Sequence, residues 1–225
     1  MTGHGPITGK EPRTLLVLAR HGQTVWHAEN RYAGVSDIGL TPHGVAQAAR
    51  LAEWARTARL DRIVCSPVPR ALETAWPSAR ATGLTPAVED ALREIDFGVA
   101  EGRTIAELRS ADPDMVARFL ADPVTHHFPQ GEPPAEAADR ATAALRDIAA
   151  AHPGRTVLVV AHNTIVRLSL CRLMGIDLRS YRTVFPRLRN CALTEVSLPP
   201  GGIGTASLLA FNIPLALGGV PAVSP

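Results

Sequence analysis

The sequence contains few aromatic residues, few cysteines and no long apolar run. Aromatic residues make up 4% of its 225 residues, so we expect a core of Leu, Val, Ile and Ala. The three cysteines, Cys65, Cys171 and Cys191, are widely spaced and form no CxxC pair, which predicts reduced, buried thiols and gives no motif for a catalytic one. No segment approaches the roughly 20 apolar residues that a membrane-spanning helix requires.

A strong charge of one sign is also missing. The formal net charge is +2, which argues against a dedicated nucleic-acid surface but not against a local basic pocket. Residues 1–14 hold only scattered apolar positions and do not look like a signal peptide. We therefore predict a cytoplasmic protein with no nucleic-acid or membrane partner, and the sequence leaves a homodimer open.

Short apolar runs alternate with helical patterns along the chain, as in α/β proteins. The runs 15–19, 62–65 and 156–160 predict strands that are buried on both faces of a sheet. Thr41 is a good N-cap, and Pro42 suits the first turn of the helix that follows. Further helices are predicted near 68–82, 104–110, 112–121, 135–151 and 164–174, and weaker strands near 85–88, 191–197 and 205–211.

These elements predict a single domain, a three-layer α/β sandwich whose mostly parallel central sheet has helices on both faces. No repeat and no linker divides the chain, and we expect the domain to span 14–212. Residues 1–13 and 213–225 lack periodicity and contain many Gly and Pro residues, so we expect them to be flexible tails.

Basic residues and histidines follow three of the predicted strands. Arg20 and His21 come directly after the first strand, Arg70 lies just beyond the second, and His162 ends the third. The carboxyl ends of parallel strands meet at one edge of a sheet, where α/β proteins bind ligands. Each histidine alone would be an ordinary loop residue. Two histidines and two arginines together would form a cationic cage suited to a tetrahedral phosphate.

Several segments around these residues resemble, in order, the motifs of the histidine phosphatase superfamily, which also contains the cofactor-dependent phosphoglycerate mutases. The similarity covers about 15–197. It implies a phosphoglycerate mutase-like fold in which a segment at about 104–140 caps the pocket. The matching segments are LVLARHGQT at 16–24, the stretch from Tyr32 to Ala48, Ser66 to Ala75, Leu92 to Gly102, Pro129 to Arg140, and Val159 to His162.

The resemblance implies a catalytic role for five residues. His21 would attack phosphorus and carry it as a phosphohistidine, which divides one difficult displacement into two easier ones. Arg20, Arg70 and a protonated His162 would hold the non-bridging oxygens. Glu94 would protonate the leaving alkoxide and then activate water. The resemblance implies no metal and no cofactor.

Other residues in these motifs are candidates for contact with the phosphate. Thr24 would donate its hydroxyl, with a loop hydrogen bond as the alternative, and Gly22 would let the backbone approach the ligand closely. His27 stands where many members of the family have Asn; it would donate to a phosphate oxygen unless Asn30 takes that role. Three further departures concern the choice of substrate: Asn163 for the usual Gly, Ala100 for an aromatic residue, and Pro67 for an acidic one.

The resemblance favours a phosphatase over a mutase. Residues 93–98 read Arg-Glu-Ile-Asp-Phe-Gly instead of the mutase sequence Glu-Arg-His-Tyr-Gly, and only a short segment follows them. The expected function is hydrolysis of a small phosphorylated metabolite, such as a sugar phosphate. A phosphoglycerate-type mutase and a non-catalytic phosphate-binding module are the alternatives.

Two clusters have roles that the sequence leaves open. The side chains of His126 and His127 point apart in an extended segment, so contact with substrate is favoured over a metal site. The second cluster forms either a solvated face or a surface that steers a phosphorylated substrate, and consists of Arg179, Arg182, Arg187 and Arg189.

Overall fold

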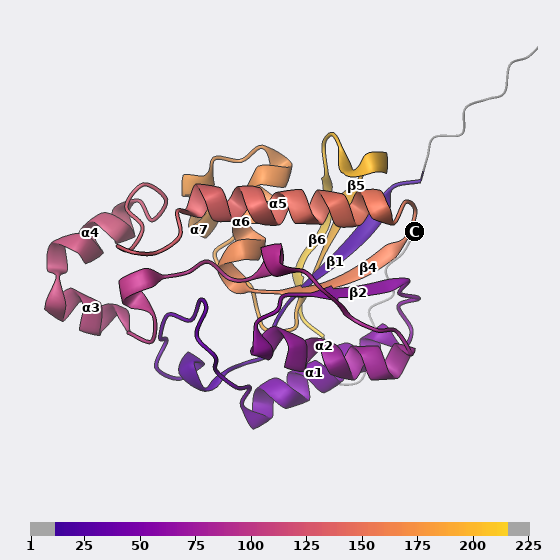
Figure 1. The fold of residues 1–225 in the computed structure, drawn as a ribbon, viewed down its shortest axis with the longest axis horizontal. Coiled ribbons are helices and arrows are strands. Elements are labelled where there is room, and N and C mark those ends of the chain that lie inside the picture. Colours follow the sequence, from indigo (N-terminus) through magenta and orange to yellow (C-terminus); the bar gives the residue numbers. More distant parts are fainter. Residues whose placement is uncertain (1–11, 216–225) are drawn as a thin grey trace, which may run out of the picture.

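A computed structural model describes residues 12–215, and a six-stranded sheet lies at its centre (Figure 1). The strands are β1 (Thr14–Arg20), β2 (Arg62–Cys65), β3 (Ala87–Val88), β4 (Thr156–Ala161), β5 (Leu193–Leu198) and β6 (Ser207–Ile213). Their order across the sheet is β3-β2-β4-β1-β5-β6. The first four strands of that order run parallel, whereas β5 is antiparallel to β1 and β6 is antiparallel to β5.

Helices cover both faces of the sheet (Figure 1). One face carries α1 (Pro42–Ala55) and α2 (Pro69–Thr82), which pack against each other. The opposite face carries α5 (Pro134–Ala151) and α6 (Asn163–Met174), and the short helix α7 (Tyr181–Val184) follows α6. The helices α3 (Ile105–Ala111) and α4 (Pro113–Ala121) project from the end of α5.

The residues of β1 divide the core into two layers. Leu16 and Leu18 belong to the apolar cluster that includes α5 and α6, whereas Val17 and Ala19 belong to the cluster that includes α1 and α2. All four side chains are at most 1% exposed. Helices cover this strand on both faces, and its apolar run is therefore uninterrupted by polar residues.

The predicted three-layer α/β sandwich with a mostly parallel sheet is confirmed, and each predicted strand and helix is present within a few residues of its expected bounds. The sequence patterns did not predict α7. Strand β6 reaches Ile213, past the expected end of the domain at 212, and Arg13, expected in a tail, donates to Ser197 at 2.8 Å. The other residues of the predicted tails, 1–11 and 216–225, lie outside the described part of the chain.

The three cysteines are buried and unpaired, as expected. Burial raises the pKa of the Cys65 and Cys171 thiols to about 11 and that of Cys191 to about 12, so these thiols stay protonated and pack as small apolar groups. Between residues 12 and 215, none of the helices has the length and apolar character to cross a bilayer.

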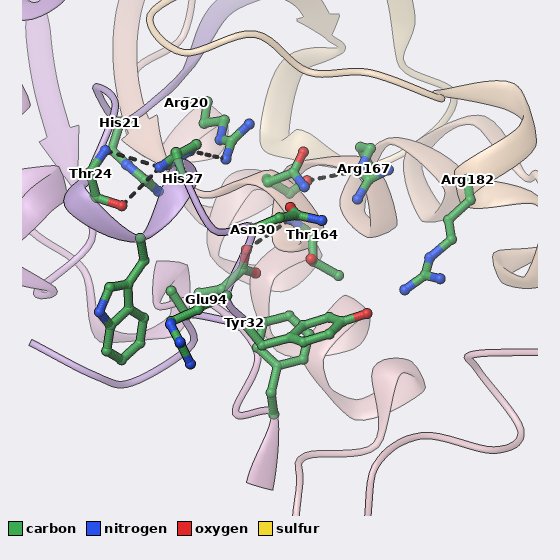
Figure 2. A pocket seen from close by; sticks show the side chains of 15 residues that line it. Arg20, His21, Thr24, His27, Asn30, Tyr32, Glu94, Thr164, Arg167 and Arg182 are labelled. Atoms are coloured by element: carbon green, nitrogen blue, oxygen red, sulfur yellow. Dashed lines mark hydrogen bonds between the residues drawn. The ribbon is translucent and has the colours of Figure 1, made fainter. Parts of the chain in front are cut away.

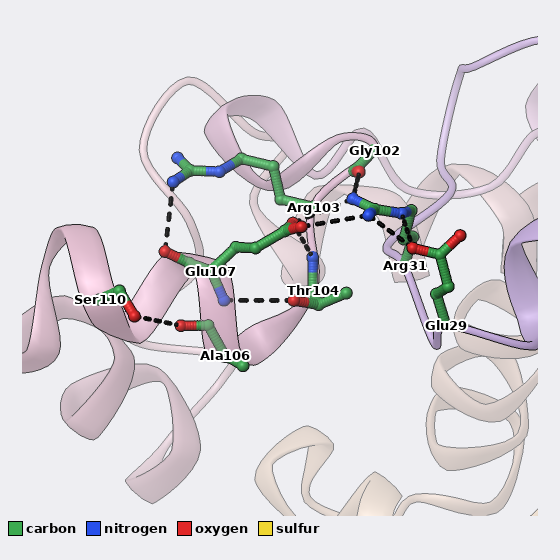
Figure 3. A network of polar contacts seen from close by, with 8 residues as sticks. All are labelled: Glu29, Arg31, Gly102, Arg103, Thr104, Ala106, Glu107 and Ser110. Carbon is green, nitrogen blue, oxygen red and sulfur yellow. Dashed lines mark hydrogen bonds and ion pairs between the residues drawn. The ribbon is translucent and has the colours of Figure 1, made fainter.

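A polar network ties the loop after β1 to helix α3 (Figure 3). The Arg31 guanidinium forms ion pairs with Glu29 at 2.6 Å and Glu107 at 2.9 Å, and it donates to the Gly102 carbonyl at 2.7 Å. The Glu107 carboxylate also accepts from the Thr104 N–H, and the Glu107 N–H donates to the Thr104 hydroxyl. These two hydrogen bonds form a capping box at the start of α3. The charge of Arg31 is thus fully paired.

Candidate active site

The ends of β1 and β4 bring two histidines together. These strands are parallel neighbours with Arg20 opposite Ala161, so His21 and His162 each follow at the same edge of the sheet. Their ring centroids are 5.2 Å apart. Both side chains are buried, at 5% and 0% exposed. The expected convergence of the strand ends is present in the structure.

The imidazole of His21 is held with Nε2 unprotonated, where it accepts a long hydrogen bond from Arg70 Nε at 3.3 Å. Its Nδ1 lies 2.7 Å from the Gly22 carbonyl oxygen, which can only accept, so the proton of the neutral ring sits on Nδ1 and Nε2 keeps its lone pair. Burial, and then the charges of His162, Arg20 and Arg70, lower the pKa of His21 well below its ordinary value. A neutral imidazole with an unprotonated Nε2 is the form that can attack phosphorus.

His162 lies beside His21 and behind the residues that line the pocket. Its Nε2 lies 2.7 Å from the Ser66 hydroxyl, and that hydroxyl oxygen accepts from the Val68 N–H at 3.3 Å. The Ser66 hydroxyl therefore fixes the orientation of the imidazole ring through Nε2. Nδ1 is buried and has no hydrogen-bond partner among the described residues. Burial and the nearby arginines lower the pKa of His162 well below its ordinary value, so the imidazole is neutral when no anion is bound.

Arg20 is fixed by a carbonyl on one side and by His27 on the other (Figure 2). Its Nη1 donates to the Leu188 carbonyl at 2.9 Å, and its Nη2 lies 2.6 Å from His27 Nε2. On the other side of the ring, His27 Nδ1 lies 2.8 Å from the Thr24 hydroxyl and 3.0 Å from the Thr24 backbone nitrogen. Arg20 Nε is buried without a partner among the described residues. It is an N–H that an anion would satisfy.

This arrangement changes the expected roles of two residues. His27 lines the pocket, but both of its ring nitrogens already have partners, so it holds Arg20 instead of donating to phosphate. Burial, followed by the charge of Arg20, lowers the pKa of His27 to about 4. Thr24 also lines the pocket and orients the His27 ring through its hydroxyl, which corresponds to the loop hydrogen bond that was its alternative.

Arg70 lies beneath the reacting histidine and outside the pocket lining. It is 0% exposed, and its Nε is 3.3 Å from His21 Nε2. The other nitrogens donate to the carbonyls of Ala33, Gly34 and Ser36, which use most of the five N–H groups of a guanidinium. In this structure Arg70 supports His21 and the loop 33–36, and its expected contact with phosphate stays a prediction.

Gly22 is required for backbone packing and not for approach to a ligand. A Cβ at Gly22 would lie 2.6 Å from the Gly44 carbonyl oxygen at the start of α1. The Gly22 N–H donates to the Thr74 hydroxyl at 2.9 Å, and its carbonyl accepts from His21. Both polar groups are therefore used, which corrects the predicted role of this residue in phosphate binding.

Glu94 reaches the pocket from the loop after β3. It is 3% exposed and lines the same cavity as His21. Its Oε1 accepts from the Ile95 and Ile165 N–H groups, whereas Oε2 accepts only from the Thr164 N–H at 2.9 Å. The carboxyl group is thus fixed on the first turn of α6, and Oε2 retains a position that can carry a proton.

The segment from Pro129 to Arg140, which the sequence marked only as a motif, holds Glu94 in place. Arg140 Nε pairs with Glu132 at 2.6 Å, and its Nη atoms donate to the carbonyls of Ala91, Arg93 and Glu94. Both members of this pair are less than a fifth exposed. The ion pair therefore fixes the backbone that carries the carboxyl group.

These groups surround a pocket of about 220 Å³ (Figure 2). Asn30 and Asn163 line it, as expected of substrate-binding candidates. His126 and His127 do not; His127 lines a separate small cavity under the cap. Of the arginine cluster, only Arg182 reaches the pocket. The complete lining is Arg20, His21, Thr24, Trp26, His27, Asn30, Arg31, Tyr32, Ala33, Glu94, Phe97, Asn163, Thr164, Arg167 and Arg182.

Sequence reasoning missed four residues of the site. Ser66 appeared in a motif without a role, yet its hydroxyl lies 2.7 Å from His162 Nε2 and orients the ring. Asn190 donates its amide to the His21 carbonyl at 2.7 Å. Arg167 lies five residues after His162, more than one helical turn along α6, and this spacing could have indicated that it lies near the site. Glu101 accepts from the Gly34 N–H and the Ser36 hydroxyl in the loop that Arg70 supports. Within residues 12–215, no cluster of three or more His, Cys, Asp or Glu side chains could hold a metal ion.

The family model for the histidine phosphatase superfamily (branch 1) matches residues 16–210. The chain belongs to the histidine phosphatase superfamily, as its motifs predict.

Named relatives within this superfamily differ in activity. The chain is 34% identical over 179 residues to a probable phosphoglycerate mutase GpmB of Klebsiella pneumoniae, covering 80% of this chain and 82% of that protein. It is 33% identical over 166 residues to phosphoserine phosphatase 1 of Hydrogenobacter thermophilus, covering 74% and 79%. The solved structure of a mycobacterial glucosyl-3-phosphoglycerate phosphatase superposes with a TM-score of 0.81 at 25% identity, covering 89% of this chain and 99% of that one. These names support a phosphatase or mutase and leave the substrate open.

Proposed function

We propose that the protein hydrolyses phosphomonoesters of small metabolites through a phosphohistidine on His21, without a metal ion. The observation that carries the proposal is the geometry of His21: its Nδ1 is committed to the Gly22 carbonyl, so Nε2 is the unprotonated nitrogen, and its one partner among the described residues is the Arg70 Nε–H at 3.3 Å. Arg20 Nε and His162 Nδ1, both unpartnered among the described residues, would supply donors for an anion beside His21. Buried donors without acceptors are unfavourable, and a phosphate would satisfy both.

The proposed reaction has two displacements. His21 Nε2 attacks phosphorus, the ester P–O bond breaks, and the Glu94 carboxyl gives its proton to the departing alkoxide. Arg20 and His162 stabilise the charge on the transferred group. In the second step the Glu94 carboxylate takes a proton from water, the resulting hydroxide attacks phosphorus, and the N–P bond breaks. His21 returns to its neutral form and phosphate leaves.

The mutase alternative uses the same phosphoenzyme but transfers the group to a second hydroxyl. The sequence at 93–98 favours the phosphatase, whereas several relatives are named as mutases. Incubation with 3-phosphoglycerate separates the two: we expect inorganic phosphate and glycerate, and a mutase would give 2-phosphoglycerate with little phosphate. A folded protein that binds phosphate but turns over none of these compounds would be the non-catalytic module.

The nucleophile is tested with p-nitrophenyl phosphate. We expect turnover that excess EDTA leaves unchanged, and an acid-labile phosphoprotein in rapidly quenched samples. The His21→Ala variant should lose the phosphoprotein and at least about 10⁴-fold in kcat, the scale of loss when a covalent nucleophile is removed. His126→Ala, on the exposed surface outside the pocket, is the control. Near-wild-type turnover by His21→Ala would contradict the proposed mechanism. Loss of activity in EDTA that a divalent ion restores would contradict metal independence.

A further inference from the structure

A second cationic wall lies in the pocket, apart from the phosphate cage. Arg167 of α6 and Arg182 of α7 line the same cavity as His21. In Figure 2 both guanidinium groups lie on the opposite side of the view from Arg20 and His21, with Thr164 between. The catalytic steps proposed above use neither of them. Their position suggests that they bind a part of the substrate other than its phosphate.

Arg167 is a buried cation without a counter-ion. It is 8% exposed, and burial lowers its pKa. Its Nε donates to the Asn163 carbonyl at 3.2 Å and its Nη1 to the Phe185 carbonyl at 3.3 Å, while the guanidinium lies 5.0 Å from the centre of the Tyr181 ring. Within the described residues it forms no ion pair, and its Nη2 has no hydrogen-bond partner. A buried guanidinium in this state is unfavourable unless an anion arrives.

Arg182 is held in place by groups that leave its charge uncompensated. Its Nε is 2.8 Å from the Tyr181 hydroxyl, and its guanidinium lies 4.6 Å from the centre of the Phe119 ring in α4. Aromatic faces orient a guanidinium and attract it weakly, but they do not neutralise it. The Tyr32 hydroxyl also lies within hydrogen-bond reach of this guanidinium, but it is neutral and does not balance the charge. This arginine is therefore positioned and still able to bind an anion.

The other charged groups of the pocket make these two arginines distinctive. Arg31, at the same rim, is paired with Glu29 and Glu107 (Figure 3). Glu94 is the only carboxylate in the lining, and backbone N–H groups occupy its oxygens. The charge of Glu94 opposes the effect of burial on the pKa of Arg167, but Glu94 forms no ion pair with Arg167 or Arg182 among the described residues.

We propose that Arg167 and Arg182 form a subsite for a carboxylate, so that the preferred substrates are phosphomonoesters of small hydroxy acids. A carboxylate has two coplanar oxygens, which match the paired N–H groups of a guanidinium. A pocket of about 220 Å³ suits a molecule of a few carbons between the two anionic groups. This inference rests on the phosphatase activity proposed above, because the phosphate cage fixes the other end of the substrate.

A matched pair of substrates tests the subsite. 3-Phosphoglycerate and glycerol 3-phosphate share a three-carbon skeleton. 3-Phosphoglycerate carries a carboxylate where glycerol 3-phosphate has a hydroxymethyl group. We expect kcat/KM to be about 10- to 100-fold higher for 3-phosphoglycerate, the effect of one or two charge-assisted hydrogen bonds. Arg182→Met should reduce this ratio at least tenfold, and Arg167→Met should do the same if it folds. Arg187→Met changes an exposed arginine outside the pocket and should leave the ratio unchanged.

Binding without turnover separates this proposal from the catalytic one. Calorimetry with the His21→Ala protein should give the same preference for 3-phosphoglycerate over glycerol 3-phosphate, and Arg182→Met should remove it. Equal affinities for the two ligands, or a ratio that both arginine variants leave intact, would overturn the subsite even if the enzyme hydrolyses p-nitrophenyl phosphate. A preserved binding preference in a protein that hydrolyses nothing would instead sustain the subsite and overturn the proposed phosphatase.

Discussion

Arg20 Nη2 lies 2.6 Å from His27 Nε2, a contact in which the imidazole must be the acceptor. A protonated His27 would place two cations against each other in a buried site, and burial together with Arg20 lowers the pKa of His27 to about 4. The geometry of Arg20 therefore depends on a neutral His27. Two neighbouring imidazoles, His21 and His162, also have pKa values well below the ordinary one, mainly through burial.

The first prediction is that the protein loses stability as the pH falls from about 6.5 towards 4. In the unfolded chain each of these imidazoles binds a proton below about pH 6.5. The folded protein keeps all three imidazoles neutral in that range, so the unfolded state binds more protons than the folded state. The free energy of unfolding therefore decreases as the pH decreases. Urea unfolding at half-unit steps of pH measures the slope.

A substitution assigns part of this slope to His27. His27→Gln keeps an acceptor for Arg20 but cannot be protonated, so proton uptake on unfolding near pH 5.5 should fall by about one. His126→Gln is the control on the exposed cap. Identical slopes for His27→Gln and the wild type would contradict a neutral His27 in the folded state.

The second prediction concerns Glu94 and the leaving group. Glu94→Gln removes the proton donor, so kcat for an alkyl phosphate should fall about 10²- to 10⁴-fold, while phosphorylation by p-nitrophenyl phosphate, whose leaving group needs no proton, should fall far less. The amide NH₂ would also face a backbone N–H of Thr164 or of Ile165, which should lower the free energy of unfolding by about 1–3 kcal/mol. Rapid-quench kinetics with both substrates measure the difference, and equal losses on the two would argue against the role of Glu94 as an acid.

The third prediction follows from the hydroxyl that fixes His162. Ser66→Ala removes the hydroxyl 2.7 Å from His162 Nε2, so the ring loses the contact that orients it beside His21 and its proton is free to redistribute between the two nitrogens. We expect kcat/KM to fall by up to about 100-fold, near the lower limit for loss of an oxyanion donor. Nitrogen chemical shifts of His162 report the tautomer directly. Ser78→Ala is the matched control because that buried hydroxyl has no partner among the described residues. An unchanged tautomer in Ser66→Ala would refute this account.

The architecture and the convergence of His21 and His162 were predictable because they depend on local patterns. Apolar runs such as 15–19 and 156–160 identify strands covered on both faces, and the position of His21 and His162 directly after them places both at one edge of the sheet. These inferences use only the geometry of parallel strands. They needed no knowledge of side-chain orientation.

The roles of individual donors could not be predicted, because they depend on contacts between distant segments. Arg70 is 34 to 37 residues from the carbonyls that occupy it, and nothing in its motif indicates that they lie nearby. In the sequence, Arg182 does not differ from the other arginines of its basic cluster. In the structure its guanidinium packs over the Phe119 and Tyr181 rings, and these contacts hold it at the pocket. The proposed carboxylate subsite depends on such long-range contacts, whereas the sequence motifs indicate only the residues expected to bind phosphate.

The fourth prediction tests the corrected role of Gly22. In Gly22→Ala the new Cβ would lie 2.6 Å from the Gly44 carbonyl oxygen, so the loop must move away from α1. Overpacking of this kind should lower the free energy of unfolding by about 1–3 kcal/mol, and the same movement should displace the carbonyl that orients His21 and reduce kcat. Gly39→Ala is the control, since its Cβ meets nothing within 4 Å. Urea unfolding and kcat are measured on both variants. A Gly22→Ala protein with normal stability but a raised KM for phosphate esters would return this glycine to the ligand-binding role first expected of it.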